Sequence, residues 1–147
     1  MANSKSADRR VRVFVYGTLK PGESNYQRYC AGRILRHEEA IAYGQLFDLP
    51  MGYPAMTPGS SPVHGVVLEF DDSQLLDILD ELEDYDPHRP AAENEYERVE
   101  LEVFTPQNQA LGKAWTYLMT EEQAERWGGQ IIPTGNWNSR LSSFLQS

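Results

Sequence analysis

The sequence predicts a single α+β domain, on three observations. Its 147 residues correspond to one domain at about 100–200 residues per domain. Five segments have the alternation or composition of β-strands, and two or three others carry the periodicity or the capping residues of helices. No repeat, heptad or low-complexity run points to another architecture. A chain of this length buries about 68–70% of its unfolded surface, so it needs no metal or disulfide for stability.

The N-terminal part is predicted to be an arm, a strand, a loop and a short helix. Residues 1–10 are polar and small without periodicity, so we expect a flexible arm followed by one domain over 11–147. Valines alternate with other side chains over 11–16, which predicts a strand. A Pro-Gly turn signal makes 17–22 a loop, and a serine can cap a short helix over 24–30.

The middle of the chain is predicted to contain two strands and the longest helix. Residues 40–49 and 63–70 have the apolar composition of strands. The segment between them, 50–62, contains four prolines and is predicted to be a long loop. Either residue of the pair Asp72-Ser73 can cap the helix that follows over 74–84.

The last part of the chain is predicted to add two strands and a helix. Residues 86–95 form a polar loop, and the alternation over 96–104 predicts a strand. After a turn at 105–111, a further strand covers 113–119. A capping box begins a helix at Thr120, and a glycine pair ends it. The remaining residues are predicted to be irregular apart from one short helix.

The charge balance excludes some classes of partner. Asp and Glu number 22 against 13 Lys and Arg, for a net charge of -9. Nucleic acids and anionic lipids both need a cationic surface, so neither is an expected partner. No apolar run approaches the about 20 residues of a membrane span, and the N-terminus does not resemble a signal peptide. Cys30 is the only cysteine and cannot form an internal disulfide, so we expect a reducing, cytoplasmic location.

Common catalytic machinery is absent from the sequence. The three histidines, His37, His64 and His88, are far apart and show no metal-ligand spacing. There is no CxxC, HExxH, GxGxxG or phosphate-binding loop. Cys30 has no nucleophile motif around it, and a buried structural thiol is the favoured interpretation. No metal or cofactor is therefore expected.

Glu83 is the carboxylate that the helical pattern singles out. It follows Leu76 and Leu79 at helical spacing, so it projects from the apolar face of the helix over 74–84. The other acids of the helix fall on the opposite side, as solvated charges do: Asp77, Asp80, Glu81 and Asp84. The helix C-terminus and the like charge of Asp80 are expected to raise the pKa of Glu83.

A carboxyl of this kind suits general acid/base chemistry. Two structural alternatives stay open: the last helical turn reaches solvent and Glu83 is hydrated, or Glu83 pairs with Arg98. The loop Tyr16-Gly17-Thr18-Leu19 is the second candidate site, because successive backbone N–H groups in such a turn can hold an anion. Its alternative is a plain connection whose glycine only makes the turn.

The ordered motifs of the chain resemble one family. Val13-Phe-Val-Tyr-Gly-Thr-Leu-Lys-Pro-Gly22 strongly resembles the opening signature of the gamma-glutamylcyclotransferase-like superfamily, in its AIG2-like branch. Further blocks resemble the proline loop, glycine-containing strand, helix end, Tyr-x-Arg strand, late strand and Gly-x-Trp segment of that family, in its order. These blocks are Gly52–Ala55, Val63–Phe70, Leu79–Tyr85, Tyr96–Val99, Ala114–Tyr117 and Gly135–Trp137.

The resemblance implies a fold and a reaction. The implied fold is a compact mixed sheet, a small barrel with flanking helices around one pocket. The implied reaction is a transferase reaction in which the α-amine of a gamma-glutamyl group attacks its own γ-carbonyl, releasing 5-oxoproline and an amine. The resemblance makes Glu83 the catalytic acid/base and requires no cofactor. A small-molecule gamma-glutamyl compound is the implied substrate.

The resemblance also implies substrate contacts. Tyr16, Gly17, Thr18 and Leu19 would offer N–H groups to the substrate carboxylate or the developing oxyanion. Tyr117 would hold the substrate through its hydroxyl, or else be a core aromatic.

Tyr96, Arg98 and Glu100 alternate onto one face of their strand, which we expect to line or border the pocket. Arg98 would orient Glu83 or the substrate carboxylate, or else form a surface ion pair.

Two departures from the family pattern concern the substrate. Asp84 stands where the family usually has glycine, and its charge is expected to raise the pKa of Glu83 further. The loop Tyr-Gly-Thr-Leu is closer to gamma-glutamylamine cyclotransferases than to the Tyr-Gly-Ser-Asn of enzymes that act on gamma-glutamyl amino acids. The alternative to an enzyme is a module of the same fold that binds a small ligand without turnover.

Overall fold

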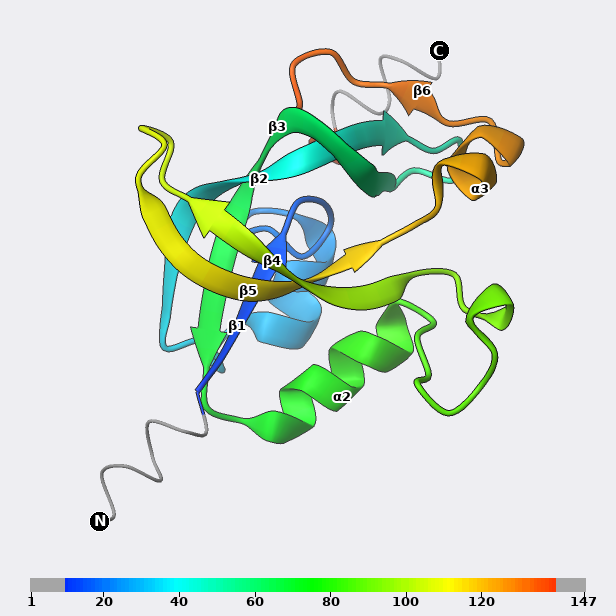
Figure 1. The fold of residues 1–147 in the computed structure, drawn as a ribbon. Coiled ribbons are helices and arrows are strands. Elements are labelled where there is room, and N and C mark those ends of the chain that lie inside the picture. The colour runs from blue at the N-terminus through cyan, green and yellow to red at the C-terminus, as the bar shows by residue number, and fades with distance from the viewer. Residues whose placement is uncertain (1–9, 140–147) are drawn as a thin grey trace.

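The computed structural model describes residues 10–139 of the chain. They contain six strands, two α-helices, one π-helical turn and one 3₁₀ turn (Figure 1). In chain order they are β1 (Val11–Val15), η1 (Tyr26–Cys30), β2 (Arg36–Asp48), β3 (Pro54–Phe70), α2 (Ser73–Leu82), η2 (Ala91–Glu93), β4 (Glu97–Phe104), β5 (Ala110–Leu118), α3 (Glu121–Arg126) and β6 (Gln130–Ile131). The α+β class predicted from the sequence is confirmed. The predicted arm up to residue 9 and the end of the tail lie outside the described residues.

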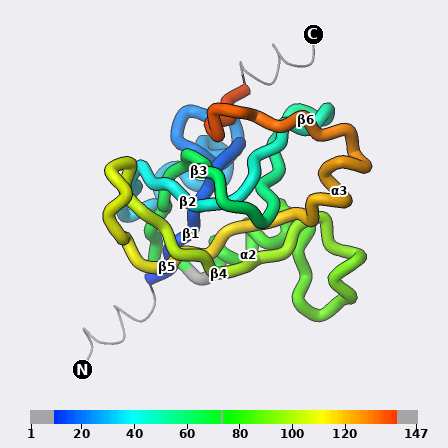
Figure 2. Tube along the Cα trace, turned by 45° about the horizontal axis from the view of Figure 1, so that its top comes forward, coloured from blue at the N-terminus to red at the C-terminus, as the bar shows by residue number. Residues whose placement is uncertain are grey.

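The strands close into a small barrel. Strand β1 pairs in parallel with β5 and antiparallel with β3. Strand β5 continues through β4 to β2, and β2 pairs back onto β3, which completes a ring of five strands. Strand β6 extends the sheet from β2 at one end. Figures 1 and 2 show α2 along one side of the sheet and α3 leading into β6.

Alternation along β1 builds a core on each of its faces. Val13 and Val15 pack with Leu75 and Leu79 of α2 in one apolar cluster. Phe14, between them in sequence, points the other way into a second cluster that includes the interior of the barrel. Because both faces of β1 are buried, the residues that follow it are held between the two cores.

The predicted loop over 50–62 is wrong, because most of it belongs to β3. Strand β3 pairs with β2 from Pro54 onward, with a register shift that leaves 58–60 without partners. Proline is tolerated at the first residue of a strand and in a bulge, where no ladder hydrogen bond needs its missing N–H. Pro54 and Pro58 occupy those two positions.

Other element boundaries differ less. Strand β2 begins at Arg36 instead of residue 40, and the short helix over 24–30 is a π-helical turn. Strand β6 was not predicted, because two residues show no alternation. The predicted caps are confirmed: the Asp72 side chain accepts from the Gln74 N–H at 3.0 Å, and Thr120 accepts from the Gln123 N–H at 3.1 Å.

The segment after β6 is fastened to the barrel through Trp137. This side chain is fully buried in the interior cluster, and its indole N–H donates to Asp48 at 2.8 Å. Gly135 precedes it with φ 68, and a Cβ there would lie 2.1 Å from the Pro62 carbonyl oxygen. Its own carbonyl accepts from the His64 N–H at 2.7 Å. The Gly-x-Trp motif is thus a packing device.

Truncation of this anchor should destabilise the whole domain. We expect Trp137→Ala to lower the free energy of unfolding by about 3–5 kcal/mol, because it leaves a cavity in the barrel interior. Urea denaturation followed by far-UV circular dichroism measures the change. The half-exposed Leu35 provides a control, and Leu35→Ala should change stability by about 0.5 kcal/mol or less. Equal stabilities of the two variants would contradict this role for Trp137.

Candidate active site

One cavity, of about 210 Å³, opens where β1 ends. A cavity of about 150 Å³ holds a benzene molecule, so this one has room for a group of amino-acid size. Five separate stretches of the chain meet around it: the end of β1 with its loop, the start of β3, the end of α2, the start of β4 and the end of β5. Its polar lining residues are Tyr16, Thr18, Asn25, Tyr53, Glu83, Glu95, Tyr96 and Tyr117.

Residues 16–19 of the loop after β1 line this cavity. A Cβ on Gly17 would lie 2.6 Å from Cγ of Pro54, so only glycine allows the loop to pack against the start of β3. The Gly17 carbonyl accepts from the Lys20 N–H, and the Thr18 carbonyl from the N–H groups of Asn25 and Tyr26. No hydrogen bond joins the N–H groups of residues 17–19 to a protein acceptor within residues 10–139. These three donors are available to a ligand.

Glu83 follows directly on the last residue of α2 and faces the cavity. The residue as a whole is half-buried, but protein closely surrounds its carboxyl. Burial, with a smaller contribution from the charge of Glu95, raises the pKa of Glu83 to about 8. Within the described chain, no hydrogen bond or ion pair to its carboxyl is formed. Arg98 pairs with Asp80 instead, so the alternative in which Glu83 pairs with Arg98 is wrong.

The cause of this pKa differs in part from the sequence-based expectation. The like charges expected from Asp80 and Asp84 do not raise it; the repulsion comes from Glu95, which lies twelve positions along the chain. Asp84 has φ 55, the left-handed conformation in which the family usually has glycine. The Arg89 guanidinium bonds its carboxylate at 2.7 Å and also its carbonyl oxygen. Asp84 is thereby turned towards Arg89.

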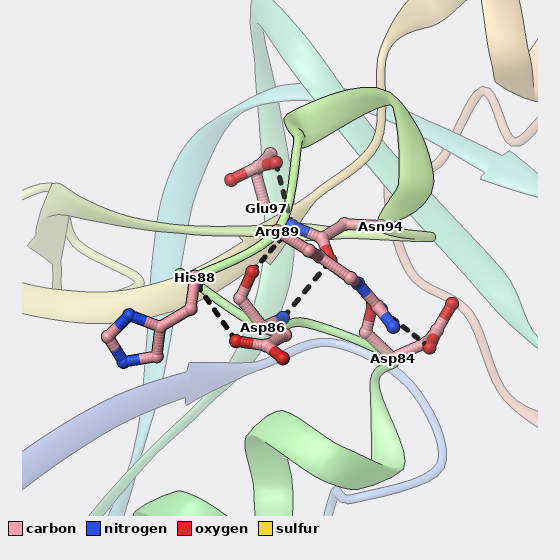
Figure 3. Close-up of polar contacts among 6 residues, drawn as sticks. All are labelled: Asp84, Asp86, His88, Arg89, Asn94 and Glu97. Atoms are coloured by element: carbon pink, nitrogen blue, oxygen red, sulfur yellow. Dashed lines mark hydrogen bonds and ion pairs between the residues drawn. The ribbon is translucent and has the colours of Figure 1, made fainter.

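Asn94 organises the loop between α2 and β4, as Figure 3 shows. Its side-chain oxygen accepts from the Asp86 N–H at 3.1 Å and from Arg89. Its amide nitrogen donates to the Asp86 carbonyl and to Glu97, each at 3.2 Å. Asn94 itself is buried. This network fixes the backbone immediately before Glu95 and Tyr96, which line the cavity.

Buried tyrosines form much of the remaining wall. The Tyr16 hydroxyl donates to the Tyr117 carbonyl at 2.5 Å and accepts from the Met56 N–H at 3.2 Å. The Tyr96 hydroxyl donates to the Pro54 carbonyl at 2.7 Å. Burial raises the pKa of the phenols of Tyr16, Tyr96 and Tyr117, so all three stay neutral. Because these phenols are neutral, any charge among the residues that line the cavity is carried by the carboxyls of Glu83 and Glu95.

Arg98 lies behind this wall and is not among the residues that line the cavity. Its guanidinium bonds Asp80 at 2.9 Å and lies over the rings of Tyr85 and Trp115. Asp80, expected to be solvated, is instead buried and also accepts from the Tyr117 hydroxyl at 2.7 Å. Packing of α2 against β4 and β5 covers this side of the helix. Arg98 is linked to the cavity wall through Asp80, which also accepts from the lining residue Tyr117.

Sequence reasoning missed Glu95 and Tyr53. Glu95 is half-buried in the cavity wall, and the Tyr53 hydroxyl donates to its carboxylate at 2.8 Å. Glu95 precedes a strand by two positions and Tyr53 lies in the proline loop, so no local pattern marked either. Cys30, by contrast, is buried as predicted, and burial raises the pKa of its thiol to about 11.

The described residues 10–139 bring together Tyr16, Gly17, Thr18, Leu19, Glu83 and Tyr117 of the predicted site, and leave Arg98 one layer away. In that same part of the chain, no three His, Cys, Asp or Glu side chains gather in a way that could hold a metal. Nor is any helix in it long and apolar enough to cross a membrane.

The fold is a small α+β barrel, and its cavity is lined by a carboxyl of raised pKa and by residues 17–19, whose N–H groups have no protein acceptor among the described residues. The chain belongs to the family described as gamma-glutamyl cyclotransferase, AIG2-like, whose sequence model matches residues 13–139. The resemblance noted in its motifs is therefore confirmed.

Curated and solved relatives agree with this family. A Vibrio cholerae protein, provisionally named a gamma-glutamylcyclotransferase, is 35% identical over 131 residues, which are 88% of this chain and 96% of that protein. The gamma-L-glutamyl-butirosin B gamma-glutamyl cyclotransferase of Niallia circulans is 34% identical over 111 residues, covering 75% and 67% of the two chains. The crystal structure of a mouse AIG2-like protein superposes with a TM-score of 0.66 at 22% identity, over 87% and 88% of the chains, and shows the shared fold.

The raised pKa of Glu83 should appear in the stability of the protein. Between its ordinary pKa, near 4.5, and its folded value of about 8, the folded state binds a proton that the unfolded state does not. Glu83 therefore makes the protein less stable as pH rises through this window, by about 1.4 kcal/mol per pKa unit at most. Glu83→Gln removes this titration. The melting temperature of Glu83→Gln relative to the parent should rise steadily from pH 5 to pH 8.

Glu81 lies on the same helix and is exposed, so Glu81→Gln is the matched control. Its melting temperature relative to the parent should stay nearly constant over the same range. A constant difference for Glu83→Gln as well would place the pKa of Glu83 in the ordinary range.

Proposed function

We propose that this protein is a gamma-glutamyl cyclotransferase that converts a gamma-glutamyl compound to 5-oxoproline and a free amine, with Glu83 as the general acid/base. The observation that carries the proposal is a carboxyl of raised pKa, about 8, in the same cavity as the open N–H groups of residues 17–19. The family relation and the named relatives support cyclotransferase activity. The residues and the substrate are our assignment.

The loop of residues 16–19 would bind the anionic part of the substrate. Its three open N–H groups suit either the α-carboxylate or the oxyanion that develops on the γ-carbonyl. Their positions are held beforehand by the Gly17–Pro54 contact and by the hydrogen bonds to the Thr18 carbonyl. A negatively charged protein can bind an anion here because local backbone dipoles, not net charge, act at this distance.

The chemistry needs few groups because it is intramolecular. The α-nitrogen forms a bond to the γ-carbonyl carbon, and the bond from that carbon to the leaving nitrogen breaks. Overall, two protons pass from the α-ammonium to the leaving nitrogen, which departs as an ammonium. One carboxyl that alternates between its two protonation states can carry both. Proximity of the reacting atoms supplies much of the rate.

The raised pKa suits both halves of this transfer. A carboxyl with an ordinary pKa is too weak a base to take a proton from an ammonium and too fully ionised to return one. A value of about 8 lies near neutral pH, where a group can act efficiently as base and then as acid. Arrival of the substrate ammonium beside Glu83 favours its ionised form.

A gamma-glutamyl amine is the proposed class of substrate. The loop sequence Tyr-Gly-Thr-Leu resembles that of gamma-glutamylamine cyclotransferases. The name of the Niallia circulans relative gives butirosin B, and not an amino acid, as the carrier of the gamma-glutamyl group. An incubation with gamma-glutamyl amines and gamma-glutamyl amino acids, with detection of 5-oxoproline, tests the proposal.

Replacement of the proposed acid/base should stop turnover without unfolding the protein. Glu83→Gln keeps the size of the side chain but cannot accept a proton, so we expect kcat to fall by about 10²–10⁴-fold. In the parent, kcat/KM should increase with pH up to about 8, as the carboxylate form of the free enzyme is populated. Steady-state kinetics on a confirmed substrate measures both.

Glu81→Gln should keep normal turnover in the same assay. Near-normal turnover by Glu83→Gln would mean that another group is the base. If the parent bound 5-oxoproline but turned over none of the gamma-glutamyl compounds, the protein would be a binding module of this fold instead.

Tyr117 should contribute to substrate binding as an acceptor. Its hydroxyl proton is already donated to Asp80, so only its oxygen lone pairs are available to a substrate ammonium. We expect Tyr117→Phe to raise KM several-fold. Tyr43 is an exposed tyrosine outside the cavity, and Tyr43→Phe should leave KM unchanged. Unchanged kinetics with a lowered melting temperature would assign Tyr117 to packing alone.

A further inference from the structure

The cavity holds a second carboxyl that the proposed chemistry does not use. Glu95 lines it together with Glu83, and no Lys, Arg or His of the described residues lines it. The two carboxyls lie close enough for the charge of Glu95 to raise the pKa of Glu83. A carboxylate removed from water needs a counter-charge or full hydrogen bonding. A pocket lined by two carboxyls and no cation therefore favours binding of a positively charged ligand.

Glu95 is held in place before any ligand arrives. The Asn94 network fixes the backbone on its N-terminal side, and its own N–H donates to the Asp84 carbonyl at 3.2 Å. Burial raises the pKa of Glu95, and the Tyr53 hydroxyl, which donates to its carboxylate at 2.8 Å, opposes this shift in part. Tyr53 is a neutral donor, and no cation within residues 10–139 pairs with the Glu95 carboxylate. Asp84, the neighbouring acid, has its own cation in Arg89.

We propose that Glu95 binds a positive charge on the leaving group, so that the substrate is a gamma-glutamyl amine whose amine part carries a second ammonium. This inference rests on the proposed cyclotransferase activity. Each charged group of such a substrate then has a partner: the α-carboxylate at residues 17–19, the α-ammonium at Glu83, and the distal ammonium at Glu95.

The position of Glu95 favours the leaving group over the α-ammonium. The α-ammonium must give up its proton to Glu83, whose carboxyl is closely surrounded by protein. Glu95 is half-buried and follows the exposed residues 91–93, and its partner Tyr53 follows the exposed Gly52. Glu95 and Tyr53 therefore each lie next to solvent-exposed chain, a side on which the departing amine can leave the cavity.

The test compares pairs of substrates that differ only in this charge. One member of each pair is the mono-gamma-glutamyl amide of 1,3-diaminopropane, 1,4-diaminobutane or 1,5-diaminopentane. The other has a methyl group in place of the distal ammonium. We expect kcat/KM to be at least about tenfold higher for the charged member of the best pair. In Glu95→Gln this ratio should fall by about tenfold or more, equivalent to about 1.4 kcal/mol.

Glu93→Gln is the matched control, since Glu93 is exposed, two positions away and outside the cavity lining; it should keep the parent ratio. A ratio near one in the parent, with 5-oxoproline formed from both members, would overturn the role of Glu95 and leave the cyclotransferase standing. An equal loss on both members in Glu95→Gln would also overturn it and assign Glu95 to the α-ammonium. No 5-oxoproline from any member would overturn the cyclotransferase and this inference together.

Discussion

Burial of the Glu83 carboxyl without a counter-charge is the constraint around which this pocket is built. The end of α2, the loop after β1 and the side chains of Tyr16, Tyr96 and Tyr117 surround the group in the cavity wall, and its burial raises its pKa. Those phenols are themselves satisfied by backbone and Asp80 partners, so they do not hydrogen-bond the carboxyl into a low-pKa form. The fold therefore makes ionisation of the Glu83 carboxyl unfavourable, and this raises its pKa.

The closed barrel is what makes this arrangement possible. Strand β1 carries apolar side chains on both faces and lies between β3 and β5, so the loop at its end cannot move independently of either core. Pro54 lies against Gly17 at the start of β3, and Trp137 fills the interior of the barrel. Stability and site geometry are coupled, because Pro54, which begins the strand β3 of the ring, also packs against the loop that lines the cavity.

Charges behind the pocket have separate partners from those within it. Arg98 neutralises Asp80, and Arg89 neutralises Asp84, each through a short ion pair. Among the residues that the structure describes, no cation pairs with the two carboxyls that line the cavity, Glu83 and Glu95. The acids that form ion pairs lie behind the cavity wall, whereas the acids that line the cavity have raised pKa values, as is common at functional sites.

The sequence by itself determined the α+β class, the family, the N-cap at Thr120, and a second N-cap at one of two adjacent residues, Asp72 or Ser73. It also singled out Glu83 and the loop after β1, which line one cavity in the structure. These features are local: they depend on helical or strand periodicity, capping chemistry or short motifs, which neighbouring residues specify. Only the tertiary structure decided that β3 runs through its prolines, that Asp80 is buried with Arg98, and that Glu95 and Tyr53 share the cavity with Glu83. Those outcomes depend on contacts between residues far apart in the chain, because burial and pairing are set by which strands and loops the closed barrel brings together.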